Sequence, residues 1–555
     1  MSFDLLHEAW LPVVTCDGDS AELGLRQALV EAGRIRRLAG ETPTVTAALH
    51  RLILALVHRA YGPAGPEEWA ELWESPLGLP AGPLDDYIAL HPGAFDLLHP
   101  QVPFLQCPHL QTLAPATTSK IVAFRATGSN RTLFDHTTAE DRPELSLAQA
   151  ARWLVTTLAF DTSGTKQPFT RVRTAQGGLA NRFATALVEG PTLHQTLLLN
   201  TVPYSPDAEL PLGTTSEDRP AWEVLPPGPE PDERAPYGWT DVLTWPSRRL
   251  LLHTRQEAGA TVVDGVVLTP GTDLVAELDR VELMAGFRRP WLKGNQQGRM
   301  QPVALDELRG IWRHSQDLLL SSDPRWWNTF KAKLRSRGAL PAEEPQRQRP
   351  AALDHIAERV EDGLIPEDTV YTLRAFGQRL GDQGGDTYFW QEESVPAPVA
   401  LMRADSARIG YLLGYAVSLA DDLGEALAMM QRDYYTAFHG QRPAARGRQQ
   451  PTPSENATRY WPRLAAPFGS LLRELGTAVV TGDSETAPLE RWERDTVELA
   501  DRAARRWLDG APRRDRLVLA AASCWDAYEE RRQELVRIYR SGLAAYSPPQ
   551  EGHGS

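Results

Sequence analysis

The most constraining feature of the chain is the helical periodicity beyond residue 400. Four long segments place apolar residues at i, i+3, i+4 and i+7, the spacing of an amphipathic helix. They cover about 407–438, 456–480, 488–508 and 512–543. The second segment shows the spacing in Leu464, Phe468, Leu471, Leu472 and Leu475. Short polar stretches separate the four segments, so the pattern predicts an antiparallel four-helix bundle.

The first 400 residues predict a mixture of helices and strands. Helical spacing covers 44–61, 67–74 and 145–160. The last of these begins with Ser146 and Gln149, which fit a capping box. Asp264-Gly265 between β-branched runs predicts a hairpin turn, and the leucine runs 197–199 and 250–252 predict buried strands.

These patterns together predict an α+β protein with two domains. We expect a large mixed α/β domain over 1–400 and an antiparallel four-helix bundle over 401–545. We expect the last residues, 546–555, to form a disordered tail.

Composition narrows the class of protein. The chain has 555 residues and a formal net charge of −14, which argues against a protein that coats nucleic acid with its whole surface. The first residues lack the basic and apolar regions of a signal peptide, and no apolar run reaches the roughly 18 residues of a membrane span. Three scattered cysteines predict neither a disulfide framework nor a zinc finger. We expect a cytoplasmic protein without a metal or another cofactor.

Charge is unevenly distributed along the chain. Residues 207–234 hold eight acidic and two basic side chains, so we expect a solvated loop or mobile insertion outside the core. Residues 120–173 hold eight basic and five acidic side chains, and residues 280–337 hold twelve and five. Two basic stretches suit a local groove for a phosphate backbone, although such stretches are as often plain solvated surface.

Three loops near these stretches have the composition of a nucleic-acid contact. Residues 128–136 combine polar groups and an arginine with Phe134, an aromatic ring that could stack on a base. Residues 162–167 follow the capped helix, and Gly164 would let the backbone approach a ligand closely. Residues 380–386 flank Gln383 with glycines, so its side chain can project from the surface.

Motifs of common enzyme classes are absent from the sequence. It contains no G-x-x-x-x-G-K-[ST], no G-x-G-x-x-G, no G-x-S-x-G and no H-E-x-x-H. Asp135-His136 has the form of a phosphohydrolase dyad, but no further ligands with suitable spacing accompany it. Two alternatives to a nucleic-acid role stay open: a metal-dependent hydrolase that uses Asp135, His136 and His99, and a purely structural helical protein.

Several short segments, taken in their order and spacing, resemble one known family. They are Phe3-Asp4-Leu5-Leu6-His7, Phe95-Asp96-Leu97-Leu98-His99, Leu133-Phe134-Asp135-His136, Thr196-Leu197-Leu198-Leu199-Asn200 and Pro220-Ala221-Trp222-Glu223. The chain resembles the CasA family, the large subunits of the type I-E CRISPR surveillance complex Cascade. The resemblance runs through the whole chain and is strongest before residue 225.

The resemblance implies a function without catalysis. A CasA subunit inspects duplex DNA for the protospacer-adjacent motif (PAM) and helps to open the duplex, so that the guide RNA (crRNA) pairs with the target strand. The expected partners are double-stranded target DNA, the 5′ handle of the crRNA, the other Cascade subunits and a helicase-nuclease. No membrane is expected among them.

The resemblance also implies site residues. The family's PAM loop falls on Ser163, Gly164, Thr165 and Lys166, its duplex wedge on Gln383 and Gly384, its crRNA-handle loop on Asn130, Phe134, Asp135 and His136, and a basic DNA contact on Lys293. A PAM-contacting lysine of the family has no clear counterpart in 266–273. The four-cysteine cluster of some relatives is absent, so no zinc is expected.

Overall fold

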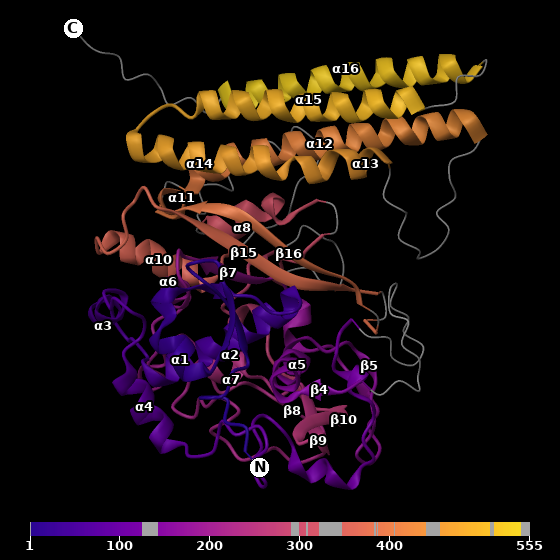
Figure 1. The fold of residues 1–555 in the computed structure, drawn as a ribbon. Coiled ribbons are helices and arrows are strands. Elements are labelled where there is room, and N and C mark those ends of the chain that lie inside the picture. Colours follow the sequence, from indigo (N-terminus) through magenta and orange to yellow (C-terminus); the bar gives the residue numbers. More distant parts are fainter. Residues whose placement is uncertain are drawn as a thin grey trace.

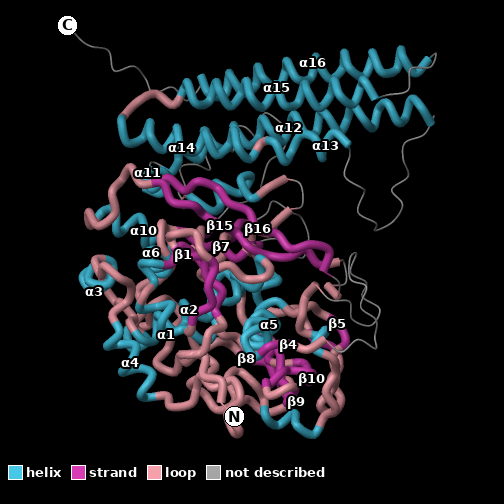
Figure 2. The backbone as a smooth tube through the Cα atoms, viewed as in Figure 1, coloured by secondary structure: helices cyan, strands magenta, loops and turns pink. Residues whose placement is uncertain are grey.

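The computed structural model describes residues 2–124, 143–289, 299–306, 309–320, 347–381, 384–385, 387–403, 406–439, 455–510 and 516–544. Figure 1 shows a body of helices and strands, two long strands above it, and long helices stacked across the top. Figure 2 shows that loops make up much of the body, whereas the top is helical. The prediction of a mixed α/β part followed by a helical part is confirmed. The folding of these parts as separate domains stays a prediction.

The body begins with a small antiparallel sheet. Its strands, in spatial order, are β2 (Ser20–Leu23), β1 (Leu11–Thr15) and β3 (Ile35–Leu38). Three helices lie on the same flank of the body in Figure 1: α1 (Leu25–Val30), α3 (Pro66–Trp73) and α4 (Ala81–Leu90). The predicted helix at 67–74 is therefore confirmed as α3.

Two packed helices form the centre of the body. Helix α2 (Pro43–Ala60) is buried along almost its whole length, and the Thr42 hydroxyl caps its start. Helix α5 (Leu147–Phe160) packs against α2. It begins with the predicted capping box, in which Ser146 and Gln149 exchange side-chain-to-backbone hydrogen bonds. A helix that is apolar on nearly all sides belongs in the core of a large protein.

The long hairpin of the body turns at a different place from the one predicted. Its sheet consists of β4 (Leu145–Ser146), β10 (Ala260–Pro270) and β9 (Arg248–Glu257). The chain turns at Ala258-Gly259, so the prediction of a turn at Asp264-Gly265 is wrong. The register shifts between Val263 and Gly265, which makes Asp264 the extra residue of a bulge. A methyl group on Gly265 would lie 2.9 Å from Pro115, so this glycine serves close packing. The predicted strand at 250–252 is confirmed within β9.

The leucine run 197–199 is helical, so its prediction as a strand is wrong. It ends helix α6 (Leu193–Leu199), where the Thr192 hydroxyl accepts a hydrogen bond from the Gln195 amide. Consecutive leucines suit a buried helix as well as a buried strand, and periodicity alone does not separate them. The threonine cap, which satisfies a free amide of the first turn, favours the helix.

The acid-rich segment 207–234 is anchored in the body, so its prediction as a part outside the core is wrong. The buried Asp218 carboxylate accepts hydrogen bonds from the Thr240 amide (3.1 Å) and hydroxyl (2.8 Å). Glu223 forms a bidentate ion pair with Arg59, at 2.6 and 2.7 Å. The other acidic residues of the segment lie at the surface. Asp232 also pairs with the buried Arg249 at 2.8 Å. At least three of the eight acidic side chains therefore stabilise the fold, and the composition did not distinguish them.

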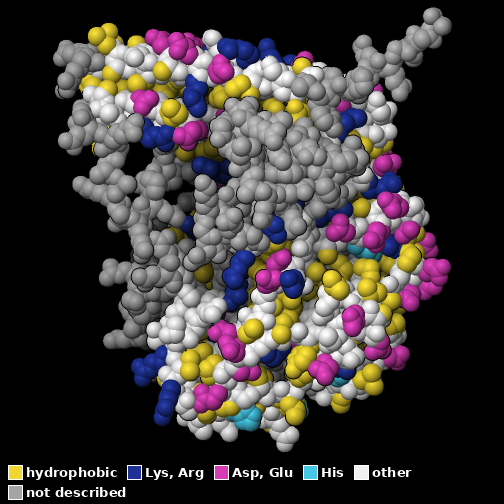
Figure 3. Space-filling view, turned by 180° about the vertical axis from the view of Figure 1, so that it is seen from behind, with side chains coloured by type: hydrophobic (Ala, Val, Ile, Leu, Met, Phe, Trp, Pro, Cys, Tyr) yellow, Lys and Arg dark blue, Asp and Glu magenta, His cyan; other side chains and the backbone are white. Residues whose placement is uncertain are grey.

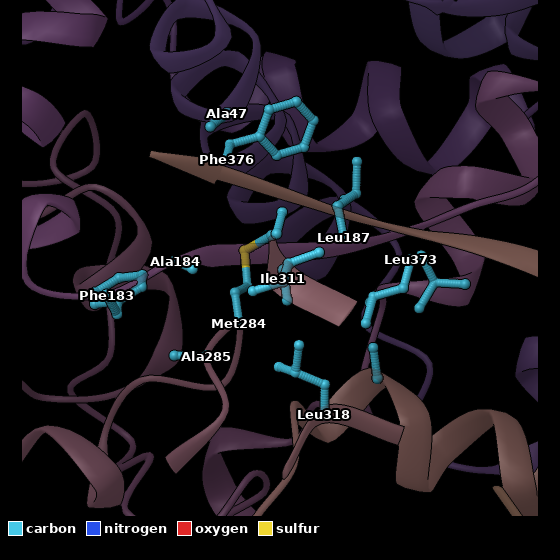
Figure 4. Packing of buried hydrophobic residues seen from close by; sticks show 14 of the residues in the cluster. Ala47, Phe183, Ala184, Leu187, Met284, Ala285, Ile311, Leu318, Leu373 and Phe376 are labelled. Carbon is cyan, nitrogen blue, oxygen red and sulfur yellow. The ribbon is translucent and has the colours of Figure 1, made fainter. Parts of the chain in front are cut away.

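A three-stranded sheet lies between the body and the helical region. Its strands, in spatial order, are β16 (Thr387–Pro398), β15 (Val370–Leu380) and β7 (Thr185–Glu189), all antiparallel. Leu373 and Phe376 of β15 belong to one hydrophobic cluster with Leu187 of β7 and Ala47 of α2, as Figure 4 shows. The middle strand thus joins the sheet to the central helices of the body.

The helical region follows the sheet directly. Its helices are α11 (Val399–Arg403), α12 (Ser406–His439), α13 (Glu455–Tyr460), α14 (Ala465–Thr481), α15 (Thr486–Gly510) and α16 (Arg516–Ala544). The four predicted helical segments are confirmed as helices. The second is interrupted by a 3-10 turn, Trp461–Arg463, because Pro462 has no amide hydrogen. Helix α12 packs against α15 and α16, and α14 packs against α15.

The helical region packs closely against the sheet. Helix α14 packs on β16, and a methyl group on Gly476 would lie 2.5 Å from Pro398. Trp312 packs against Phe468 and Trp492 of the helical region, with ring centroids 4.9 and 6.0 Å apart. This contact fixes the helices against the end of the sheet that lies farther from the hairpin turn.

The remaining elements are short. They are α7 (Trp239–Leu243), α8 (Ser315–Leu319), α10 (Ala351–Glu361), β5 (Gly164–Thr165), β6 (Thr174–Ala175), β8 (Asp232–Arg234), β11 (Thr272–Leu274), β12 (Phe287–Arg288), β13 (Gln301–Pro302) and β14 (Arg347–Gln348). Strands β8 and β11 pair in parallel, β12 lies between β13 and β14, and β5 pairs with β6.

Candidate nucleic-acid interface

The loop that follows α5 forms the base of a small hairpin at the surface. Gly164 and Thr165 make up β5, which pairs with Thr174 and Ala175 of β6. The Thr165 side chain is exposed. Gly164 has φ of +120°, and a methyl group on it would meet no other part of the chain within 4 Å. Glycine is therefore required there by the backbone conformation and not by crowding.

A buried carboxylate holds this hairpin to the body. Asp161, directly after α5, receives the Lys166 ammonium at 2.7 Å and the Arg248 guanidinium at 2.5 Å. Arg248 also donates to the carbonyl oxygens of Thr162 (3.0 Å) and Gln176 (2.6 Å). Both ends of the 162–176 segment are therefore tied to one arginine of β9.

Burial opposes charge on both members of the Asp161–Lys166 pair. For Asp161, the positive charges of Arg248 and Lys166 outweigh burial and hold the pKa of the carboxyl below its usual value. For Lys166, burial outweighs the Asp161 carboxylate and lowers the pKa of the ammonium. The Lys166 side chain is only 11% exposed. Its amine is thus engaged in holding the loop, and the surface presents Ser163, Gly164 and Thr165.

The same end of α5 also binds the long β15–β16 hairpin. Gln378 of β15 donates to the Phe160 carbonyl (2.7 Å) and to the Asn181 side-chain oxygen (2.8 Å). Asn181 in turn donates to the Phe160 and Asp161 carbonyls at 3.0 and 2.8 Å. The free carbonyls at the end of a helix need such partners, and here a side chain of the hairpin supplies one of them.

The two hairpins meet where the predicted site residues lie. The Ser163 amide donates to the Gly384 carbonyl at 2.8 Å. Figure 1 shows the free end of β15 and β16 next to β5. Gly384 has φ of +68°, and a methyl group on it would lie 2.3 Å from the Ser163 hydroxyl oxygen. The structure thus brings together two loops that are more than 200 residues apart in the sequence.

Exposed cations surround this meeting point. Lys120, Arg171, Arg173 and Arg379 have exposed side chains, and within the described ranges no ion pair engages them. Arg152, from the same basic stretch, is buried and instead pairs with Glu41 at 2.7 Å. The predicted basic stretch 120–173 therefore divides into structural residues and surface residues.

Several predicted site residues fall outside the described part of the chain. They are Asn130, Phe134, Asp135 and His136 of the predicted RNA loop, Gln383 of the predicted wedge, and Lys293. Their roles stay predictions. No group of three or more His, Cys, Asp or Glu residues in the described ranges could hold a metal ion.

Sequence reasoning missed the residues that position the two loops. Asp161 and Arg248 are 87 positions apart, and Gln378 and Phe160 are 218 apart. The only local signal was the end of the predicted helix at Phe160, since helix ends leave carbonyl groups that need partners. Nothing in the sequence near Arg248 or Gln378 identifies those partners.

One concentration of acidic side chains lies away from this interface. Figure 3, the view from behind, shows Asp and Glu side chains along the right-hand flank. That is the flank on which α3 and α4 lie in Figure 1. Helix α3 carries the exposed Glu67, Glu68 and Glu71, and the exposed Glu74 follows it directly. Strand β5 lies on the opposite flank, so this concentration of acidic charge does not fall on the candidate interface. None of the helices in the described ranges is both long and apolar enough to span a membrane.

Comparison with known proteins assigns a family to this architecture. A family model described as CRISPR-associated protein Cse1 matches residues 4–503. A curated CRISPR-associated protein CasA/Cse1 from Thermus thermophilus is 32% identical over 454 residues, which cover 80% of each chain.

Solved structures agree with the sequence match. The crystal structure of Cse1 from Thermobifida fusca has a TM-score of 0.77 at 29% identity, with 97% of this chain and 98% of that chain covered. A chain of a CRISPR RNA-guided surveillance complex has a TM-score of 0.70 at 20% identity, with 96% and 99% covered. The second likeness is one of fold.

Proposed function

The chain belongs to the CRISPR-associated Cse1 (CasA) family, and from this membership we propose that it is the large, non-catalytic subunit of a type I-E Cascade complex. In that role it recognises the PAM in duplex DNA and helps to open the duplex at the start of the R-loop. It also contacts the crRNA 5′ handle and supports recruitment of the helicase-nuclease. The fold shared with a chain of an RNA-guided surveillance complex supports the assembly part of this proposal.

One observation carries the DNA-reading part of the proposal. The Ser163 amide and the Gly384 carbonyl form a hydrogen bond of 2.8 Å, so the proposed PAM loop and the base of the proposed wedge are adjacent. A subunit that reads a short motif and then separates the next base pair needs these two functions side by side. Separate loops at distant places on the surface could not act on consecutive base pairs.

The chemistry of the 163–165 segment suits the minor groove. That groove presents a degenerate pattern that distinguishes mainly A·T from G·C pairs. The half-buried backbone at Gly164, together with the small polar side chains of Ser163 and Thr165, can approach base edges closely without strong sequence demands. We propose that Lys166 contributes by positioning the loop through Asp161.

The energy required of a wedge is small. Duplex opening costs about 1.4 kcal/mol of stacking per base-pair step, and pairing with the guide RNA returns nearly as much. The wedge therefore has to hold the first step open only until pairing begins. The Gln383 amide can both donate and accept hydrogen bonds, so we propose that it replaces those lost by the separated bases.

Binding and R-loop formation by the assembled complex test this proposal. We expect the complex with wild-type chain to bind a PAM-containing duplex more tightly than one with a scrambled PAM. The Gln383→Ala complex should keep PAM-dependent binding but form fewer R-loops, measured by permanganate reactivity of unpaired thymines. Gln111→Ala, at an exposed position of the body, is the matched control and should behave as wild type.

Two results would contradict the proposal. If the wild-type complex bound the PAM-containing and the scrambled duplex equally, the proposal that the chain recognises the PAM would be wrong. Metal-dependent turnover of a phosphoester by the isolated chain, lost in Asp135→Asn, would favour the hydrolase alternative. The described residues give that alternative no metal-ligand cluster.

A further inference from the structure

One large aromatic side chain is exposed at the end of the β15–β16 hairpin. Tyr388 of β16 is 63% exposed, the most exposed aromatic side chain in the described part of the chain. A tyrosine ring in water leaves a large apolar surface unburied, and an exposed aromatic beside a nucleic-acid site is the usual platform for a base.

The strand register presents Tyr388 outward. Arg379 pairs with Phe389 and Leu380 pairs with Thr387, so Tyr388 is the extra residue on its strand. A bulge of this kind bends the strand and redirects a side chain, and such bulges occur often beside functional sites. Phe389 and Trp390, which continue the strand, are partly buried.

The Tyr388 ring lies against the backbone of Gly381, which has no side chain. A methyl group on Gly381 would lie 3.1 Å from the Tyr388 hydroxyl oxygen and 3.2 Å from the ring carbon that bears it. One part of the ring thus rests on Gly381 while most of its surface remains exposed. The exposed Arg379 is its neighbour on the opposite strand, and a guanidinium there suits a backbone phosphate.

Tyr388 is close in the chain to the meeting point of the two loops. It lies four residues after Gly384, whose carbonyl accepts the Ser163 amide. The hairpin that carries it is held to the end of α5 by the hydrogen bonds of Gln378. The hairpin end that carries the ring is therefore held beside the proposed PAM loop.

We propose that Tyr388 stacks on a nucleobase that becomes unpaired beside the PAM when the duplex opens. This inference rests on the proposed function and adds a residue to it. Gln383 would separate the first pair, and Tyr388 would receive one of the freed bases. A base that stacks on the ring recovers part of the stacking that it loses when it leaves the duplex.

The expected size of the effect follows from measured stacking contacts. Base–aromatic stacking is worth about 1–3 kcal/mol per base, or roughly a 5-fold to 150-fold change in equilibrium. Tyr388→Ala should lower R-loop formation by a factor in that range. Tyr388→Phe keeps the aromatic face and should stay within about 3-fold of wild type. Tyr388→Leu keeps apolar area but has no ring, so it should resemble Tyr388→Ala.

A cycle of protein and DNA changes tests stacking directly. R-loop formation is measured for wild-type and Tyr388→Ala complexes on duplexes with a single abasic nucleotide at each of the first positions beside the PAM. If Tyr388 stacks on one base, the loss caused by Tyr388→Ala disappears when that base is absent. Tyr237→Ala, at a tyrosine that is 44% exposed on the body, is the matched control.

The outcomes separate this inference from the proposed function. Equal losses for Tyr388→Ala on every abasic duplex would overturn stacking and indicate a structural role. Unchanged R-loop formation by Tyr388→Ala would overturn it as well, with PAM recognition intact. A wild-type complex that ignores the PAM would instead overturn the proposed function on which the inference rests.

Discussion

Gly384 occupies a position that disfavours any side chain, for two reasons. Its φ of +68° lies in the left-handed region, and the Ser163 hydroxyl fills the space where a side chain would begin. Gly385, next to it, has no positive φ, and a methyl group there would lie 3.7 Å from the Ser163 carbonyl, an ordinary contact. Adjacent glycines thus differ in what they tolerate.

We predict that Gly384→Ala separates the two loops, whereas Gly385→Ala does not. The left-handed backbone costs a residue with a side chain about 1–2 kcal/mol, and the contact with Ser163 adds to this. The Ser163 amide should lose its bond to the Gly384 carbonyl and exchange with deuterium roughly 5- to 30-fold faster. Unchanged exchange of this amide in Gly384→Ala would contradict the geometry.

Residue-scale predictions from the sequence succeeded where the interaction is local. The capping box of Ser146 and Gln149 was predictable because both partners lie within one turn of helix. The burial of the Lys166 amine was not, because its cause is the Asp161 carboxylate held between the helix end and Arg248. A sequence pattern identifies a charged residue but does not show which charges the fold brings to it.

At the scale of elements, one strand holds the small hairpin. Arg248 of β9 contacts the Asp161 carboxylate and the carbonyls of Thr162 and Gln176. A lysine at this place could keep one ion pair but has no planar fork of donors to reach both carbonyls. The order of the β5–β6 hairpin therefore depends on an arginine from a distant part of the chain.

We predict that Arg248→Lys loosens this hairpin without unfolding the body. Trypsin should cleave after Arg171 or Arg173 at least several-fold faster, as followed by mass spectrometry of the released peptides. The control is Arg255→Lys on the same strand, where the arginine is 48% exposed and forms only surface ion pairs. Equal cleavage of the two variants would show that Arg248 does not hold the hairpin.

Elements were predictable from the sequence when their periodicity was long. The helices α2, α5, α12 and α16 each extend over many turns, and the repeat alone identifies them. The short run 197–199 and the turn at Asp264-Gly265 were predicted wrongly. The Thr192 cap favours a helix for the run 197–199. Close packing against Pro115, from another segment, explains the glycine at position 265. Neither cause was visible in the apolar pattern on which the predictions were based.

At the scale of the whole molecule, buried histidines link folding to pH, and three of them show it most strongly. Burial lowers the pKa of His50 and His58 to about 4 and that of His355 to about 3. The folded chain keeps these rings neutral, whereas the unfolded chain binds protons on them below an ordinary pKa of about 6.5. The free energy of unfolding therefore decreases as the pH falls from about 6.5 towards 4.

We predict a steep acid-induced loss of stability with a histidine contribution. Between its lowered pKa and about 6.5, each of these histidines decreases the free energy of unfolding by roughly 1.4 kcal/mol for each pH unit that the pH falls. The melting temperature measured from pH 7.5 to 4.5 should fall less steeply in His58→Asn than in wild type. His7→Gln, at a side chain that is 65% exposed, should keep the wild-type slope. A slope unchanged by His58→Asn would contradict the buried neutral state.

The long strand β16 has a mechanical consequence. Its twelve residues, Thr387–Pro398, span about 40 Å at 3.3 Å per residue. One end carries the bulged Tyr388 near the loops that we propose read DNA, and the other ends at Pro398, against which Gly476 of α14 packs. A strand that is paired along its length is stiff. Gly476 has no side chain that could rearrange and absorb a movement of Pro398. We expect β16 to move as a rigid unit. A displacement of its hairpin end would then shift Pro398 against α14 in the helical region.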